Sequence, residues 1–349
     1  MMQFFFRVDA SNTIGMGHFM ECIALADFFK KTFNCGIHFL VNDFTPIKRF
    51  LEKRGNYFDV VQINGNEDFE HNSLEQIVKG RNPDFLICNL LERSNEYYRK
   101  IQSYVRHSIV ILDDEFQRPV PGNVVINFNI TQDPDYYRHF GGKETRYCIG
   151  PQYIPLSDTL YVKWSKKKEI PDSCGTIFLN QGGSDPFGLT AKIIHALEGL
   201  DLEQIIHVVV GDAVSVHQRR ELKSLMRSLS KKYQFEWGAS HEKMRALMEQ
   251  SDLAITAAGN TLYELAILGV PSIVICHHER HNRVASKFAE RGAAVNLGIG
   301  SDISESVIAA AVKNLLDSRE KRIRMSEAIK LVVDGKGCRR IAEMVESLC

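Results

Sequence analysis

The chain alternates short apolar runs with longer segments of helical periodicity, and no other feature constrains its fold as strongly. Short apolar runs are typical of strands buried in a parallel sheet, and the longer segments are typical of the helices that cover it. Strands that alternate with helices along a chain form parallel sheets. Because the pattern occurs twice, the sequence predicts an α/β protein with two doubly wound, Rossmann-like parallel-sheet domains facing each other across a cleft.

The expected elements follow from this alternation. The expected strands are Phe4–Asp9, Ile37–Asn42, Phe58–Ile63, Phe85–Cys88, Ile109–Leu112, Thr176–Asn180, Ile205–Val210, Gln234–Trp237, Leu253–Thr256, Ser272–Cys276 and Ala293–Leu297. The expected helices are 18–33, 45–54, 73–80, 94–105, 187–199, 215–232, 241–250, 260–268, 282–291, 304–316 and 319–333.

The length also favours two domains, because a single core rarely grows past about 250–300 residues and the chain has 349. The stretch 118–171 holds six of the ten prolines, so we expect it to be irregular and to contain the domain boundary. The predicted domains are residues 1–160 and 161–334. Residues 335–349 are expected to form a helix that crosses back to the first domain.

Composition excludes several classes of protein. Lys+Arg and Asp+Glu both number 43, and this balance argues against nucleic acid as a partner. No apolar stretch approaches the ~18 residues of a membrane span, and the start does not resemble a signal peptide. The eight cysteines show no C-x-x-C spacing, which favours free thiols over disulfides or zinc. We expect a cytoplasmic monomer or weak dimer without stable membrane insertion.

The first strand-to-helix turn carries the densest chemical signal. It runs from Arg7 to His18, and Gly15 and Gly17 leave room for a ligand near the backbone. His18 begins the helix, where the helix dipole disfavours an imidazolium and leaves a neutral ring available as a base. A capping or packing histidine is the alternative. Asp9 could orient the ring or accept backbone N–H bonds in the turn.

Two turns of the second half predict a nucleotide site. The sequence Asn180-Gln181-Gly182-Gly183-Ser184-Asp185 leads into a helix, a layout that presents N–H groups to phosphate. An ordinary turn with Ser184 or Asp185 as helix cap is the alternative. After the strand ending at Thr256, small residues 257–259 open space, and Glu264 could accept bonds from ribose hydroxyls or could be a surface glutamate.

Two weaker patterns are not assigned a function. His277-His278-Glu279-Arg280-His281 lacks the spacing of a helical zinc motif, so we expect no metal there. Asp113-Asp114-Glu115 ends a strand, where an acidic turn is more often solvated or capped.

These motifs together resemble a known family. The unbroken pattern R-x-D-x-S-x-x-I-G-x-G-H from Arg7 to His18 resembles the UDP-sugar hydrolases of pseudaminic acid biosynthesis and their spore-coat polysaccharide relatives. The second half, with Gly182-Gly183-Ser184-Asp185 and A-G-N-T-L-Y-E-L-A-x-L-G-V-P from Ala258, is similar to the lipid-linked N-acetylglucosaminyltransferase of peptidoglycan synthesis. The resemblance covers roughly residues 4–330 and implies a GT-B-like fold.

The resemblance implies hydrolysis of UDP-2,4-diacetamido-2,4,6-trideoxy-β-L-altropyranose at its anomeric carbon, with release of UDP and without a metal or other cofactor. It gives His18 the role of catalytic base and Glu264 that of ribose ligand, and it places Gly183 and Ser184 at the diphosphate. The full set of expected substrate-binding residues is Asp9, Asn12, Gly15, Gly17, Gly183, Ser184, Gly259, Asn260, Thr261 and Glu264.

The chain departs from these hydrolases at two places. It reads Asn89-Leu90-Leu91 where they have Asp-x-Tyr, and Leu156-Ser157-Asp158 where they have a leucine-arginine pair. Both differences fall on the sugar side and leave the sugar and the acceptor open. The alternatives are a glycosyltransferase of the same architecture and a nucleotide-sugar-binding protein without turnover. A transferase would expose an apolar patch near the Phe-rich segment 18–33, where core packing is the other interpretation.

Overall fold

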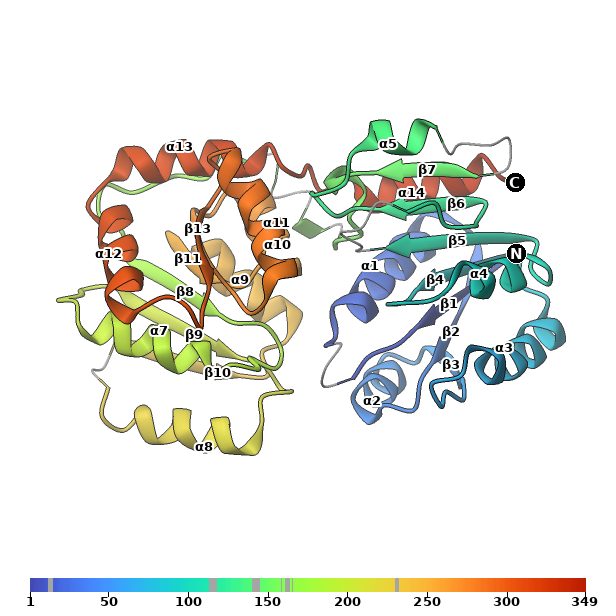
Figure 1. Cartoon of the computed structure of the whole chain (residues 1–349), viewed down its shortest axis with the longest axis horizontal. Coiled ribbons are helices and arrows are strands. Elements are labelled where there is room, and N and C mark those ends of the chain that lie inside the picture. Colours follow the sequence, from blue (N-terminus) through green and yellow to red (C-terminus); the bar gives the residue numbers. More distant parts are fainter. Residues whose placement is uncertain are drawn as a thin grey trace. The chain divides into compact units, whose positions relative to one another are not determined.

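The computed structural model describes residues 1–11, 15–112, 118–139, 145–157, 159–160, 164, 166–229 and 232–349. The chain divides into two compact units (Figure 1). The first comprises Met1–Asp158 together with Gly335–Cys349, and the second comprises Thr159–Asp334. No helix in the described ranges is long and apolar enough to cross a membrane.

The first unit is built on a seven-stranded sheet of order β3-β2-β1-β4-β5-β6-β7, and its strands all pair in parallel. The strands are β1 (Met2–Val8), β2 (Cys35–Val41), β3 (Tyr57–Val60), β4 (Phe85–Asn89), β5 (His107–Leu112), β6 (Val124–Asn127) and β7 (Arg146–Ile149). The helices are α1 (Gly17–Thr32), α2 (Thr45–Lys53), α3 (Glu67–Arg81), α4 (Asn95–Gln102), α5 (Pro134–Arg138), η1 (Pro151–Tyr153) and α14 (Gly337–Glu346).

Phenylalanines of β1 and α1 form the core on one face of this sheet. The ring centroids of Phe4 and Phe29 lie 4.7 Å apart, and those of Phe19 and Phe50 lie 5.4 Å apart. Phe19 and Phe29 are fully buried, so these two rings of the Phe-rich segment pack in the core and not on the surface. The helix α14 packs against α1 and η1.

The stretch 118–171 is less irregular than expected. It contributes β6, β7, α5 and η1, and β6 pairs with β5 through Ile109 and Val124. The sequence analysis missed these strands because each has only four residues, and because Pro119 and Pro121 precede β6. The prolines lie outside the two strands, where they interrupt no ladder hydrogen bond.

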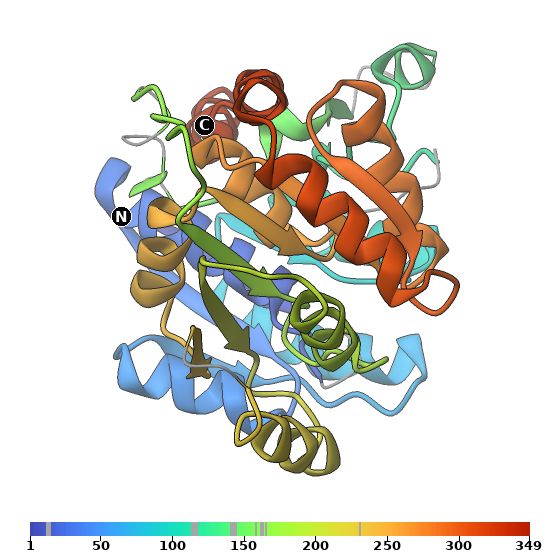
Figure 2. The ribbon, with the colours of Figure 1, turned by 90° about the vertical axis from the view of Figure 1, so that its left-hand side faces the viewer.

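The second unit has a six-stranded parallel sheet of order β10-β9-β8-β11-β12-β13 (Figure 2). The strands are β8 (Thr176–Asn180), β9 (Ile205–Val210), β10 (Tyr233–Trp237), β11 (Leu253–Thr256), β12 (Ser272–Cys276) and β13 (Val295–Ile299). The helices are α7 (Leu189–Glu198), α8 (Val216–Leu225), α9 (His241–Gln250), α10 (Asn260–Leu268), α11 (Glu279–Glu290), α12 (Glu305–Leu316) and α13 (Arg319–Lys330). Buried side chains of α7, α8 and α12 share one apolar cluster with this sheet.

Each sheet has one point at which the strand order reverses. In the first unit it lies between β1 and β4, and in the second between β8 and β11. Ligands of such sheets bind beyond the carboxyl ends of the strands at this point. The expected class of two Rossmann-like, doubly wound domains is therefore confirmed, and its topology places the candidate site residues at both reversal points.

Candidate active site

His18 lies at the reversal point of the first unit. It is the second residue of α1, and its ring is 9% exposed. Its Nδ1 lies 2.7 Å from Oδ1 of Asn89, the last residue of β4. The other ring nitrogen, Nε2, has no hydrogen-bond partner in the described part of the chain. The ring is therefore held at one nitrogen and free at the other, as a base requires.

The turn before His18 depends on glycine. Gly15 has a φ of 78°, a left-handed conformation that favours glycine, and its N–H donates to the carbonyl of Ser11 at 2.8 Å. A Cβ at Gly15 would meet nothing within 4 Å, so space lies open beside it. Gly17 is the first residue of α1. Asn12 lies outside the described residues.

Asp9 does not orient the His18 ring, contrary to one of the two roles expected for it. Its carboxylate lies 2.5 Å from an Arg7 guanidinium nitrogen and 2.9 Å from one of Arg93. The partner that holds the ring is Asn89. The reason is geometric: Asp9 follows β1 directly and faces the guanidinium of Arg7, two residues before it. A contact between Asp9 and substrate stays a prediction.

Arg7 and Glu70 complete this buried ion-pair network. The Arg7 side chain is fully buried, and its Nη2 lies 2.7 Å from Oε1 of Glu70. The same oxygen accepts from the Tyr97 hydroxyl at 2.6 Å. Burial alone would raise the pKa of Glu70, but Arg7, the Tyr97 hydroxyl and Arg93 outweigh it, so the pKa is lowered. These groups can be buried because the positive charges of Arg7 and Arg93 balance the negative charges of the Asp9 and Glu70 carboxylates.

In the second unit the glycine turn after β8 presents unpartnered donors. The Asp185 carboxylate accepts from the first two N–H groups of α7, those of Leu189 and Thr190, at 2.8 and 2.9 Å. The Asp185 side chain therefore caps the first turn of α7, although the N-cap position itself is Gly188 and not Ser184 or Asp185 as one interpretation expected. The N–H groups of Gly183 and Ser184 and the Ser184 hydroxyl have no partner among the described residues. These donors, and not the start of α7, are open to an anion.

The turn after β11 leaves the sheet beside this one, because Thr256 pairs with Asn180. Gly259 is the N-cap of α10 and supplies no side-chain hydrogen bond to the helix N-terminus. Asn260 and Thr261 form the first two positions of α10. An uncapped helix N-terminus attracts negative charge.

Glu264 lies one turn further along α10 and is half-buried. Its carboxyl has no hydrogen bond or ion pair in the described ranges. Burial raises its pKa to about 7. A recessed carboxyl without a protein partner is an acceptor that a ligand can use.

The histidines after β12 pack with one another. His277 Nε2 lies 3.0 Å from the carbonyl of Gln181, and the rings of His278 and His281 are 3.9 Å apart. Burial, with the neighbouring His278 and His277, lowers the pKa of His281 to about 3, so this ring is neutral at pH 7. The described residues contain no group of three His, Cys, Asp or Glu side chains that could hold a metal ion. Asp113-Asp114-Glu115 lies outside the described residues.

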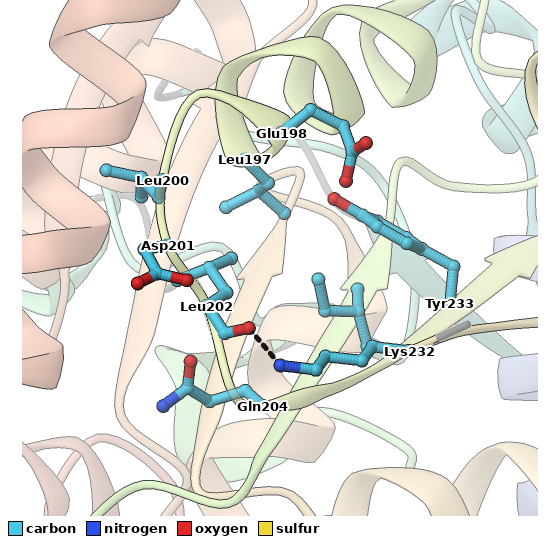
Figure 3. Close-up of a pocket in the computed structure, with 9 residues that line it drawn as sticks. Leu197, Glu198, Leu200, Asp201, Leu202, Gln204, Lys232 and Tyr233 are labelled. Carbon is cyan, nitrogen blue, oxygen red and sulfur yellow. Dashed lines mark hydrogen bonds between the residues drawn. The ribbon is translucent and has the colours of Figure 1, made fainter. Parts of the chain in front are cut away.

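A cavity of about 270 Å³ lies in the second unit, at the end of the sheet opposite to these turns (Figure 3). Its lining includes Ile206 near the start of β9 and Tyr233 at the start of β10. These are the amino ends of the strands, whereas ligands of such sheets bind at the carboxyl ends. The cavity is therefore separate from the turns that carry the candidate residues.

The sequence is similar to known proteins over part or nearly all of its length. Residues 188–346 match the UDP-N-acetylglucosamine 2-epimerase family. The spore coat polysaccharide biosynthesis protein SpsG of Bacillus subtilis (strain 168) is 27% identical over 338 residues, which cover 96% of this chain and 95% of SpsG.

Solved structures share the fold at low sequence identity. MurG of Acinetobacter baumannii superposes with a TM-score of 0.70 at 15% identity, covering 99% of both chains. UDP-GlcNAc 2-epimerase of Neisseria meningitidis, bound to UDP-GlcNAc, gives a TM-score of 0.68 at 11% identity and covers 99% of this chain and 100% of its own. These likenesses confirm the GT-B-like fold class.

The sequence analysis missed two residues that shape these turns. The sequence pattern at Asn89 indicates only a difference from the hydrolases; the signal for a partner of His18 is a polar residue that ends the strand beside β1. Gly211, just after β9, was not noted at all. A Cβ on Gly211 would overlap the backbone of Gly183, so this glycine allows the two turns to pack together.

Proposed function

We propose that this protein is an enzyme that hydrolyses a UDP-linked sugar at the anomeric carbon and releases UDP. The observation that carries the proposal is the His18 imidazole, held by Asn89 at Nδ1 and without a hydrogen-bond partner at Nε2 among the residues that the structure describes. A neutral imidazole with a free nitrogen can take a proton from water, and a positioned base contributes about 10²–10⁴-fold to a rate. His18 is therefore assigned as the general base.

The nucleotide is assigned to the second unit. The donors of Gly183 and Ser184, which have no partner among the described residues, and the N-terminus of α10 suit a diphosphate. The Glu264 carboxyl, which has no partner in the described part of the chain, suits the two ribose hydroxyls. The match of residues 188–346 to UDP-N-acetylglucosamine 2-epimerases, one of which has been solved with UDP-GlcNAc, supports UDP as the nucleotide. Gly15, Gly17, Gly259, Asn260 and Thr261 are assigned as further substrate contacts.

The proposed reaction balances without a further reactant. The water oxygen bonds to the anomeric carbon as the bond from that carbon to the β-phosphate oxygen breaks. The electron pair of the broken bond goes to the phosphate, and Nε2 of His18 takes the proton of water. The N–H donors of the glycine turn stabilise the charge that develops on the leaving diphosphate.

The sugar we propose first is the 2,4-diacetamido-2,4,6-trideoxy-β-L-altropyranose of pseudaminic acid biosynthesis. The similarity to SpsG over nearly the whole chain supports a role in surface polysaccharide synthesis. Leu91 and Ser157 stand where the hydrolases that the sequence resembles have tyrosine and arginine. A related UDP-sugar that lacks contacts with those two groups is the alternative substrate.

Incubation with UDP-sugars in ¹⁸O-labelled water tests the proposal. The panel contains the UDP-diacetamido sugar and UDP-GlcNAc, without an acceptor, and NMR and mass spectrometry follow the products. We expect UDP release with ¹⁸O on the anomeric carbon of the free sugar. Label on UDP would show cleavage at phosphorus and would contradict the proposal. Release of UDP only after a hydroxyl acceptor is added would identify a glycosyltransferase.

A further inference from the structure

We propose that Asn89 and Glu21 together fix the tautomer of His18, with the proton on Nδ1 and the lone pair on Nε2. The inference rests on the proposed function only where Nε2 acts as the proton acceptor, because the tautomer itself is a property of the free protein. Asn89 and Glu21 are positioning residues in this scheme, because neither is assigned a contact with substrate.

The three side chains come from two neighbouring elements and are buried together. His18 and Glu21 are three residues apart on α1, which places them on one face of the helix. Asn89 ends β4, the strand that pairs with β1 through Val8. Asn89 is 1% exposed and Glu21 is 3% exposed. Little water can therefore replace the hydrogen bonds between them.

Hydrogen-bond chemistry determines which way the Asn89 amide faces. Its amide nitrogen lies 2.7 Å from a carboxylate oxygen of Glu21 and 3.3 Å from the backbone carbonyl of His18. The backbone carbonyl of His18 can only accept, and an ionised Glu21 carboxylate can only accept, so the NH₂ group must face them. The amide oxygen is then left to face Nδ1 of His18 at 2.7 Å.

This orientation determines the proton position on the imidazole. The Asn89 oxygen can only accept, so Nδ1 must carry the hydrogen that lies between them. A neutral ring with its hydrogen on Nδ1 has its lone pair on Nε2, the nitrogen without a partner in the described ranges. The reverse tautomer would leave a lone pair against the amide oxygen in a buried site. Glu21 thus acts on His18 through Asn89 without touching the ring.

Nitrogen NMR of ¹⁵N-histidine-labelled full-length protein, without ligand, tests the tautomer. At a pH where His18 is neutral, we expect a pyrrole-type signal at Nδ1 and a pyridine-type signal at Nε2, assigned by comparison with His18→Asn. The opposite pattern, or averaged signals, would overturn the proposal. This readout requires no substrate, so its failure is distinct from a failure of the proposed hydrolysis.

Variants separate positioning from simple structural support. Asn89→Asp retains an acceptor facing Nδ1 and should keep the Nδ1–H signature, whereas Asn89→Leu should give averaged signals. Glu21→Gln can present either a donor or an acceptor to Asn89, so the tautomer ratio should move toward Nε2–H. An unchanged ratio in both Asn89→Leu and Glu21→Gln would contradict the proposal. The control is Asn127→Leu, which removes a buried asparagine that ends β6 and has no hydrogen bond to His18.

Turnover of the UDP-diacetamido sugar adds a second readout. Asn89→Leu should lower kcat by up to about 10⁴-fold, the loss that a wrong histidine tautomer causes in a serine-protease triad. Asn89→Asp should restore most of kcat relative to Asn89→Leu. Equal kcat values for the two variants, with the NMR difference present, would show that the tautomer is fixed but is not used in the reaction.

Discussion

At the residue scale, Arg7 compensates buried negative charge in the first unit. Its guanidinium is fully buried and bonds to both Asp9 and Glu70. Removal of one partner of a buried ion pair costs about 3–5 kcal/mol, and without Arg7 the two carboxylates of Asp9 and Glu70 share only the single charge of Arg93. We therefore expect Arg7→Met to lower the free energy of unfolding by about that amount, as measured by urea denaturation at pH 7.

The matched control is Arg54→Met. Arg54 pairs with Asp27 at 2.6 Å, but both side chains are more than one-third exposed. Exposed pairs contribute about 0–1 kcal/mol, so this variant should unfold nearly as the unchanged protein does. Equal losses in the two variants would contradict the buried network.

The pH dependence of this network has a definite sign. The pKa of Glu70 is lowered in the folded protein, so its stabilising effect is present above its ordinary value of 4.5 and is lost as pH falls through the lowered value. The difference in unfolding free energy between the unchanged protein and Arg7→Met should therefore shrink when the pH falls below 4.5. A difference that grows on acidification would contradict this assignment.

Glu264 should couple UDP binding to pH. Its pKa is raised to about 7 by burial, so the carboxyl changes its protonation state near neutral pH. Ribose hydroxyls bind the ionised form better, so affinity for UDP should fall as pH decreases from 8 to 6. Calorimetry in buffers of different ionisation enthalpy should detect proton release on binding near pH 7. Glu264→Gln should bind more weakly and release fewer protons; proton release equal to that of the unchanged protein would rule Glu264 out.

At the element scale, contact between the turns after β8 and β9 positions the Gly183 donors. Gly211→Ala would force a Cβ into the backbone of Gly183, and such overpacking costs about 1–3 kcal/mol. We expect this variant to be less stable in thermal denaturation and to bind UDP more weakly.

Gly183→Ala is the matched comparison. Its Cβ would meet nothing within 4 Å, so stability should be unchanged while UDP affinity falls, because the methyl group projects where the diphosphate is proposed. Unchanged UDP affinity in Gly183→Ala would remove this turn from the proposed site.

The elements also show where sequence patterns predict structure and where they do not. Strands β8, β9, β11 and β12 match their expected bounds, because they are continuous apolar runs buried on both faces. The helix expected at 73–80 begins earlier, at Glu67, because the Asn66 side chain caps it by accepting from Asp68 and Phe69. The expected helix 73–80 follows from the spacing of apolar residues, and the Asn66 cap is a polar residue that does not belong to that pattern. Strands β6 and β7 were missed because four residues carry too weak a pattern.

The candidate site was only partly predictable for a similar reason. His18, Ser184 and Glu264 each follow the end of a strand along the chain. Such a position can be predicted from the neighbouring residues in the sequence. The bond between His18 and Asn89 joins residues 71 positions apart, and it exists because β4 pairs with β1. The choice between Asp9 and Asn89 as ring partner depends on that pairing and on Arg7, which occupies the Asp9 carboxylate.

At the scale of the whole molecule, we propose that UDP binds to the second unit and that the base belongs to the first. Hydrogen exchange of the full chain with UDP alone should therefore slow at residues 182–184 and 259–262. Exchange in 15–25, which includes His18, should not change, because UDP lacks the sugar. Protection confined to 15–25 would assign the nucleotide to the first unit and contradict this division.

The central claim is that His18 performs the proton transfer and the second unit holds the nucleotide. The most direct measurement compares His18→Asn with the unchanged protein for UDP release from the UDP-diacetamido sugar and for UDP affinity by calorimetry. The account predicts a fall in kcat of about 10²–10⁴-fold with nearly unchanged UDP affinity. A His18→Asn protein that releases UDP at the unchanged rate would contradict it.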